Sequence, residues 1–245
     1  MSEALVVLVG LAAFLGFFHT AIGPDHYLPF VVLAKSEAWS FKRTMLWTFV
    51  CGVGHVSSSI LLGGLGVALG WNIKSLEGVE SARETLASFA LIGFGGLYML
   101  WGLYLAYRGR GHSHAHFHKG GISHTHIHGH KTSAESDNEK QSHKKKTHSH
   151  KHRFAKWAIF MIFVLGPCEP LVPMLIFPAA QHSILGIALV AATYSLATIG
   201  TMMIAVVAGY LGLRMVSGQI IDRYIHAMSG AAIMLSGLVI NLLGL

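Results

Sequence analysis

A small set of ionisable and thiol side chains lies within otherwise apolar stretches of this 245-residue sequence. Such groups are costly inside a membrane or an apolar core, so they usually face a pathway or a partner. Imidazole, carboxylate and thiolate donors together suit nickel, cobalt, zinc or copper better than magnesium or calcium. The candidate metal ligands are His19, Asp25, His26, His55, Cys168 and Glu169.

The spacing of the first three candidates predicts that they meet at a break in a helix. On an unbroken helix His19 and His26 would lie two turns apart on one face, separated by about 10 Å. Pro24 removes a backbone N–H and disfavours the helical conformation at the preceding residue, which here is Gly23. The resulting break would shorten the separation and turn Asp25 towards the same point.

Each candidate also has a purely structural interpretation. His55 would serve as a hydrogen-bond donor between helices, and Asp25 would cap the helix that begins after the break. Cys168 would pack as a small buried hydrophobic residue. His182 and His226 lie near the ends of apolar runs and are interpreted as interfacial residues outside the site.

The composition predicts an integral membrane protein. Hydrophobic residues make up 53% of the chain and charged residues only 12%, with a mean hydropathy of +0.54. Arg108–Arg153 holds 10 of the 18 Lys/Arg and 12 of the 17 His, so the remainder is still more apolar. This argues against a soluble enzyme, a secreted disulfide scaffold and a nucleic-acid-binding domain. We therefore expect the lipid bilayer as a partner, no enzymatic activity and no nucleic-acid partner.

Six stretches are long and apolar enough to cross a hydrocarbon core, which takes about 20 helical residues. They lack the alternating pattern of barrel strands, so the sequence predicts an all-α, polytopic fold with six transmembrane helices. The predicted spans are Ala4–Ala34, Thr44–Leu69, Leu86–Tyr107, Phe154–Ala180, Ile184–Leu213 and Tyr224–Leu243.

The prolines indicate an internal repeat. All six lie in the first and fourth spans, where GPDHYLPFVVLA (from Gly23) aligns with GPCEPLVPMLIF (from Gly166). Three spans per half require the second half to be inverted, which is a plan of secondary transporters with broken helices at the binding site. The expected organisation is a first repeat at 1–107, a His-rich loop at 108–153 and a second repeat at 154–245.

Basic residues predict the orientation in the membrane. The loops after spans one, three and five carry fifteen Lys/Arg, whereas those after spans two and four carry two. Cytoplasmic loops are the basic ones. We expect both termini outside and the His-rich loop on the cytoplasmic side of the cytoplasmic (inner) membrane.

The long loop has a metal-binding composition, with histidine at alternate positions. We expect it to be disordered and to act as an auxiliary metal buffer. Its candidate ligands are His112, His114, His116, His118, His124, His126, His128 and His130.

The motifs also resemble a known family. His19 followed by Asp25-His26, and GxGH ending at His55, are similar to the nickel/cobalt transporter (NicO) family. The GPDH and GPCEPLVP pair is similar to its six-helix branch of urease-accessory-like and sulfite-exporter-like proteins in the LysE-type transporter superfamily. The resemblance implies movement of Ni²⁺ or Co²⁺ across the membrane, with His19, Asp25, His26 and His55 as motif positions.

The function expected from these features is secondary transport of a divalent transition-metal cation by alternating access. Nickel or cobalt is the expected cargo, zinc is an alternative, and no permanently bound cofactor is expected. The sequence has no nucleotide-binding motif, so the energy would come from an ion or metal gradient, or from a partner protein that this chain does not encode. Protons are a candidate coupling ion through Asp25 or Glu169, since a buried carboxyl group exchanges protons more readily near neutral pH.

Two other functions are open. The GPC motif is similar to that of CcdA-type thiol–disulfide electron carriers, which need a reactive cysteine in each half. Here Asp25 stands at the position equivalent to Cys168, and Cys51 lies elsewhere, in the second span. The other alternative is a sulfite or oxyanion exporter, with the anion at the N-terminal ends of the half-helices. Asp25 and Glu169 at those places argue against an anion.

Overall fold

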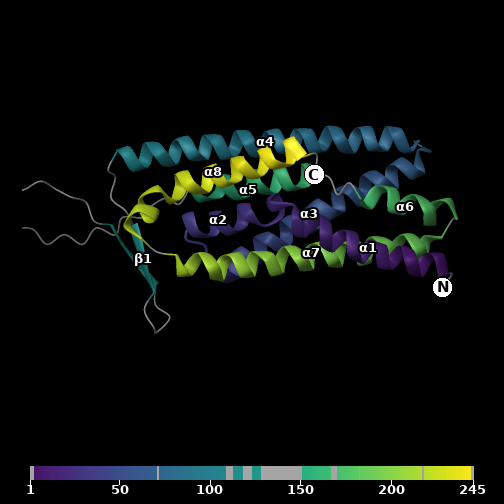
Figure 1. The fold of residues 1–245 in the computed structure, drawn as a ribbon, viewed down its shortest axis with the longest axis horizontal. Coiled ribbons are helices and arrows are strands. Elements are labelled where there is room, and N and C mark those ends of the chain that lie inside the picture. Colours follow the sequence, from purple (N-terminus) through teal and green to yellow (C-terminus); the bar gives the residue numbers. More distant parts are fainter. Residues whose placement is uncertain are drawn as a thin grey trace, which may run out of the picture.

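The computed structural model describes residues 3–70, 72–108, 113–117, 123–127, 151–166, 170–181, 183–216 and 218–243. They form an elongated bundle of helices (Figure 1). The elements are α1 (Glu3–Ile22), η1 (Pro24–His26), α2 (Leu28–Ser36), α3 (Phe41–Ala68), α4 (Ile73–Tyr107), β1 (Ser113–Phe117), β2 (Ser123–Ile127), α5 (Lys151–Leu165), α6 (Leu171–Ala180), α7 (Ile184–Met215) and α8 (Gln219–Leu243).

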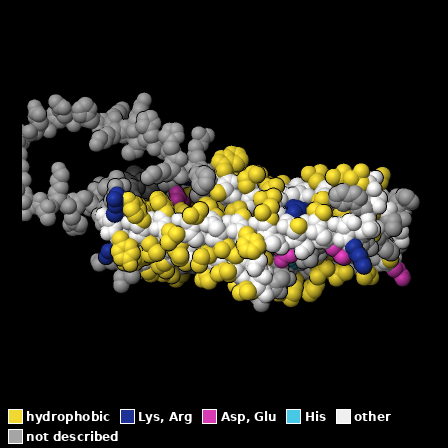
Figure 2. All heavy atoms as spheres, turned by 90° about the horizontal axis from the view of Figure 1, so that it is seen from above, with side chains coloured by type: hydrophobic (Ala, Val, Ile, Leu, Met, Phe, Trp, Pro, Cys, Tyr) yellow, Lys and Arg dark blue, Asp and Glu magenta, His cyan; other side chains and the backbone are white. Residues whose placement is uncertain are grey.

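The outside of the bundle is apolar, as a membrane protein requires. Large hydrophobic side chains such as Leu61, Leu97 and Ile204 are each 72% exposed, and hydrophobic atoms extend along the face in Figure 2. Within the described residues, five helices are long and apolar enough to cross a membrane, namely α1, α3, α4, α7 and α8. The predicted polytopic, all-α membrane fold is confirmed.

The first span is interrupted where the sequence predicted. α1 ends at Ile22, Gly23 adopts an extended conformation (φ −74°, ψ 102°), and a single 3₁₀ turn leads into α2. Pro24 and Pro29 each stand in the first turn of the element that follows, where the missing N–H costs no intrahelical hydrogen bond. The chain therefore restarts its helix twice within a few residues.

The fourth span is also divided into two helices. α5 ends at Leu165 and α6 begins at Leu171. Each piece is too short to count alone as a membrane span, and the apolar part of α5 covers Lys156–Leu165. Both interruptions predicted from the Gly-Pro pairs are thus confirmed in the described residues.

The third span begins earlier than predicted. The sequence predicts that this span starts at Leu86, because charged residues precede it. In the structure α4 already begins at Ile73. Asn72 caps its N-terminus, and the Asn72 side chain accepts a hydrogen bond from Ser75 N–H at 2.8 Å. Arg83, one of the two Lys/Arg that the predicted spans placed in the loop after the second span, therefore lies inside a helix. Its side chain has a structural role described below.

Each divided helix packs on the second helix of the other half of the chain. α1 and α2 contact α7, while α5 and α6 contact α3. The third helices of the two halves, α4 and α8, pack against each other. This exchange is the arrangement expected of an inverted repeat. The repeat boundaries themselves stay a prediction.

Glycines allow α4 and α8 to approach closely. A Cβ atom on Gly102 would lie 2.3 Å from the backbone nitrogen of Ala227, and one on Gly230 would lie 2.2 Å from that of Met99. Small residues at helix contacts are typical of membrane bundles. They make the α4–α8 pair a closely packed unit.

Gly102→Ala is expected to lower the thermal stability of the purified protein, because the added methyl group forces the two backbones apart. Overpacking of this kind costs about 1–3 kcal/mol. Gly93→Ala is the matched control on the same helix, since a Cβ at Gly93 meets nothing within 4 Å. Equal melting temperatures for the two variants, measured in detergent, would contradict the close contact.

The His-rich segment contains two short strands. β1 and β2 pair in antiparallel fashion, with His114 opposite His126 and His116 opposite His124. The expectation of disorder for the rest of this segment, including 109–112, 118–122 and 128–150, lies outside the described residues.

Candidate metal centre at the break in the first span

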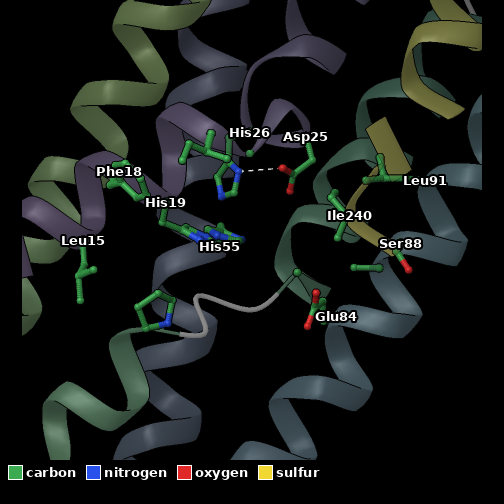
Figure 3. Close-up of a pocket in the computed structure, with 15 residues that line it drawn as sticks. Leu15, Phe18, His19, Asp25, His26, His55, Glu84, Ser88, Leu91 and Ile240 are labelled. Carbon is green, nitrogen blue, oxygen red and sulfur yellow. Dashed lines mark hydrogen bonds and ion pairs between the residues drawn. The ribbon is translucent and has the colours of Figure 1, made fainter. Parts of the chain in front are cut away.

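Three histidines meet at the interruption of the first span. His19 comes from the last turn of α1, His26 from η1 and His55 from the middle of α3 (Figure 3). One ring nitrogen of each lies within 4.8 Å of the others. The ring centroids of His19 and His26 are 4.8 Å apart, and those of His26 and His55 are 5.1 Å apart.

The break produces this arrangement. The extended Gly23 and the 3₁₀ turn stand between the two residues, and their ring centroids lie 4.8 Å apart. The structure thus brings the rings of His19 and His26 together at the break. His26 and His55 are 3% and 4% exposed, so the centre is buried among helices.

Hydrogen bonds fix the orientation of two of the imidazole rings. Nδ1 of His55 donates to the carbonyl oxygen of Phe163 at 3.1 Å, and Nδ1 of His26 donates to Oδ1 of Asp25 at 3.0 Å. In the neutral form of each ring, a hydrogen on Nδ1 places the lone pair on Nε2. This is the arrangement that second partners impose on metal-binding histidines.

The Nε2 atoms of His19, His26 and His55 are buried, and none of them has a hydrogen-bond partner among the described residues. Buried polar atoms in native proteins are almost always satisfied, so three orphaned atoms in one place require an explanation. A cation bound by the three lone pairs would supply one. Imidazole nitrogen suits zinc, copper, iron and nickel.

Asp25 orients the centre and does not cap a helix. Tyr27 is the N-cap of α2 and forms no side-chain capping bond. The Asp25 carboxylate instead holds His26, and its side chain is 24% exposed. The geometry is compatible with both interpretations of His55. Its Nδ1 forms the interhelical hydrogen bond to Phe163, and its Nε2 is the nitrogen available as a ligand.

A cavity of about 250 Å³ adjoins the histidines. Beyond the histidines and Asp25, its polar lining comes from Glu84 and Ser88 of α4. The sequence prediction missed Glu84 because it placed the start of the third span at Leu86. The cavity thus carries two carboxyl groups beside the imidazoles.

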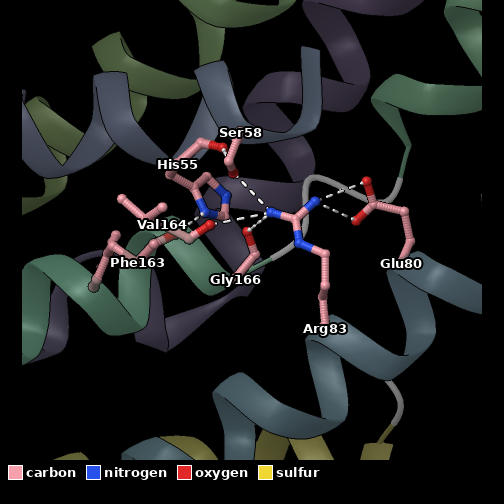
Figure 4. Close-up of polar contacts among 7 residues, drawn as sticks. All are labelled: His55, Ser58, Glu80, Arg83, Phe163, Val164 and Gly166. Atoms are coloured by element: carbon pink, nitrogen blue, oxygen red, sulfur yellow. Dashed lines mark hydrogen bonds and ion pairs between the residues drawn. The ribbon is translucent and has the colours of Figure 1, made fainter. Parts of the chain in front are cut away.

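Arg83 holds the end of α5 against this centre (Figure 4). Its Nη2 donates to Oγ of Ser58 at 2.7 Å and to the carbonyl oxygens of Val164 and Gly166 at 3.1 and 3.3 Å. Its Nη1 donates to both carboxylate oxygens of Glu80, at 3.1 and 3.2 Å. The carbonyl groups at the C-terminus of a helix lack intrahelical partners. Arg83 satisfies two carbonyl groups at the end of α5, those of Val164 and Gly166.

The remaining predicted ligands are not part of the described centre. Cys168 and Glu169 lie outside the described residues, as do His112, His118, His128 and His130. Only the backbone of His114, His116, His124 and His126 is described, in β1 and β2. Cys51 is a free thiol, 1% exposed, one helical turn before His55.

The fold defines a polytopic α-helical membrane protein with a cavity beside the break in its first span. Residues 28–239 match the family described as the cytochrome c biogenesis protein transmembrane region, and the chain belongs to this family. No curated protein and no solved structure significantly matches the chain.

The family match corrects the resemblance drawn from the motifs. The chain does not belong to the nickel/cobalt transporter family. GPDH and GxGH are short motifs. More than one family can have a broken helix with a histidine beside the break, so these motifs alone do not identify the family. The match supports a membrane transporter-like protein. At the level of the family it favours the thiol–disulfide carrier over metal transport.

Proposed function

We propose that the protein is a secondary transporter that carries a divalent transition-metal cation through the centre formed by His19, His26 and His55. The observation that carries this proposal is the group of three buried Nε2 atoms without hydrogen-bond partners in the described structure. Three neutral imidazoles would replace part of the cation's water shell. The carboxylates of Asp25 and Glu84 would offset its charge.

The transport cycle in this proposal uses the two divided helices. The cation leaves water in the 250 Å³ cavity and binds the three histidines. The two halves of the chain then rock about the centre and open it to the other side. The donors suit nickel, cobalt or zinc. The two carboxyl groups in the cavity lining disfavour a sulfite or other oxyanion cargo.

The proposed orientation rests on the distribution of basic residues in the sequence. Both termini would lie outside the cytoplasmic membrane and the His-rich segment in the cytoplasm. The histidines of that segment, from His112 to His130, would then buffer the cation on the cytoplasmic side.

Thiol–disulfide electron transfer is the second candidate, and the family match favours it. In that reaction Cys51 and Cys168 would be oxidised to a disulfide while a disulfide of a partner protein is reduced to two thiols. The chain contains two cysteines in total. Gly166, two residues before Cys168, lies against His55, one turn from Cys51: a Cβ on Gly166 would be 3.3 Å from Nδ1 of His55.

Cys51→Ser distinguishes the two candidates. Because Cys51 lies outside the histidine centre, we expect Co²⁺ flux into proteoliposomes to stay within about twofold of the wild type. The same vesicles are assayed for reduction of a disulfide-containing protein inside them by a thiol reductant outside. Wild-type electron transfer that Cys51→Ser abolishes, together with no Co²⁺ flux, would replace metal transport with the thiol–disulfide function.

A further inference from the structure

A second polar cluster lies at the other end of α2, away from the histidine centre. Tyr98 of α4 is 9% exposed and donates its hydroxyl hydrogen to Oε1 of Glu37 at 2.8 Å. The same hydroxyl oxygen is 2.9 Å from Nδ1 of His226 on α8 and 3.2 Å from Oγ of Ser36. The cluster therefore joins residues from three separate parts of the chain.

The directions of these hydrogen bonds follow from the donors available. A tyrosine hydroxyl has one hydrogen, and here it is given to the carboxylate. The Tyr98 oxygen must then accept from Nδ1–H of His226. His226, Tyr98 and Glu37 form an unbroken chain from N–H through O–H to carboxylate. A proton that binds to the His226 ring can thus reach Glu37 when two hydrogens shift along the chain.

The cluster connects α2 to the α4–α8 pair. Ser229 of α8 donates to the carbonyl oxygen of Val32 at 3.1 Å and adds a second contact between these elements. The pair itself is held by close glycine contacts at Gly102 and Gly230. The nine-residue helix α2 lies between the two sites. His26 precedes its N-terminal end, and Glu37 directly follows its C-terminal end.

The charged groups of the neighbouring elements at this end are engaged elsewhere or exposed. Lys35 of α2 donates to the carbonyl oxygen of Leu213 at 2.8 Å, and Arg223 of α8 donates to that of Ala106 at 3.2 Å. Arg214 lies over the ring of Tyr210, and Asp222 is exposed. The ring of Trp101 packs against His226 at 5.1 Å. Glu37 and His226 are the carboxylate and the imidazole of the cluster, joined through the Tyr98 hydroxyl.

We propose that the Glu37–Tyr98–His226 chain binds the proton that is exchanged for the transported cation, an inference that rests on the proposed transport function. With Glu37 ionised, the charge-assisted bond from Tyr98 fastens α2 to the α4–α8 pair. One added proton neutralises Glu37 and weakens that bond. Release of α2 then displaces His26 and Asp25, which precede it, and so couples proton binding to the metal centre.

The test measures Co²⁺ accumulation in proteoliposomes with and without a pH gradient. Tyr98→Phe keeps the ring and its packing but removes the hydroxyl link. We expect the pH-driven part of Co²⁺ accumulation to fall at least about tenfold, while exchange of Co²⁺ at equal pH stays within about twofold of the wild type. Tyr104→Phe is the matched control on α4, since Tyr104 is 47% exposed and lies outside the cluster.

Full pH-driven accumulation by Tyr98→Phe would overturn the proposal. If the wild type moves no Co²⁺, the proposed function has failed, and the proton site is tested without metal. Acid titration of the purified protein should then produce an infrared carboxylic-acid band that Glu37→Gln removes. If the wild type and Glu37→Gln give the same infrared spectra on acid titration, the proposed proton site is overturned, whatever the result of the transport assays.

Discussion

Replacing His55 by alanine is expected to weaken binding of Co²⁺ to the purified protein by at least about 100-fold, or about 2.7 kcal/mol. Loss of residues that merely orient metal ligands costs about 10- to 100-fold in affinity, and His55 supplies a ligand nitrogen itself. The measurement is a titration of the protein in detergent with Co²⁺, followed by calorimetry and by visible absorption of the bound ion.

Two variants on α3 separate ligand loss from damage to the fold. His55→Gln keeps an N–H group that can donate to the carbonyl oxygen of Phe163 but removes the imidazole, so it should bind as weakly as His55→Ala. Cys51→Ser, one turn away and equally buried, should bind Co²⁺ as the wild type does. Tight binding by His55→Gln would show that the ring is not a ligand.

Arg83→Ala is expected to lower the free energy of unfolding by about 1.5–3 kcal/mol, the usual contribution of hydrogen bonds to a charged group. The substitution takes the cation from Glu80, whose side chain is 2% exposed, and leaves the carbonyl oxygens of Val164 and Gly166 without this donor. Thermal unfolding in detergent measures the effect.

Three comparisons define the role of Arg83. Lys74→Ala, an exposed cation on the same helix, should change stability by less than about 0.5 kcal/mol. Arg83→Lys should recover only part of the loss, because a single ammonium group lacks the planar fork of donors. Glu80→Gln combined with Arg83→Gln should be more stable than Arg83→Ala. An unchanged melting temperature for Arg83→Ala would contradict the described clamp.

The histidine centre was largely predictable because its signal is local. Gly23-Pro24 stands between two histidines in one apolar run, and proline has few ways to be accommodated there. The helix was therefore expected to break near His26, which allows the His19 and His26 rings to approach each other. His55 was predicted from a buried histidine in the next span, without any knowledge of which helix face it occupies.

The contacts of Arg83 and Glu84 were not predictable in the same way. Their charges lie at the end of an apolar run, where a membrane span and its loop look alike in sequence. Only the tertiary structure shows that α5 ends beside them and presents unpaired carbonyl groups. The contact between Tyr98 and His226 joins residues 128 positions apart. No periodicity within either helix indicates that partner.

The family was misjudged for a related reason. The short motifs indicate where a helix is broken and which ligand side chains lie at the break. Several kinds of transporter have a broken helix with ligand side chains, so the motifs do not separate them. The match extends over residues 28–239, from the start of α2 into α8, and takes precedence over the short motifs. Assignment of the cargo therefore depends on the chemistry of the centre.

X-ray absorption spectroscopy of the Co²⁺-loaded protein examines that chemistry most directly. We expect a spectrum with imidazole nitrogen scattering from three rings, reduced in His19→Ala, His26→Ala and His55→Ala alike. Coordination by oxygen alone, or a nitrogen signal that none of these substitutions changes, would contradict the account.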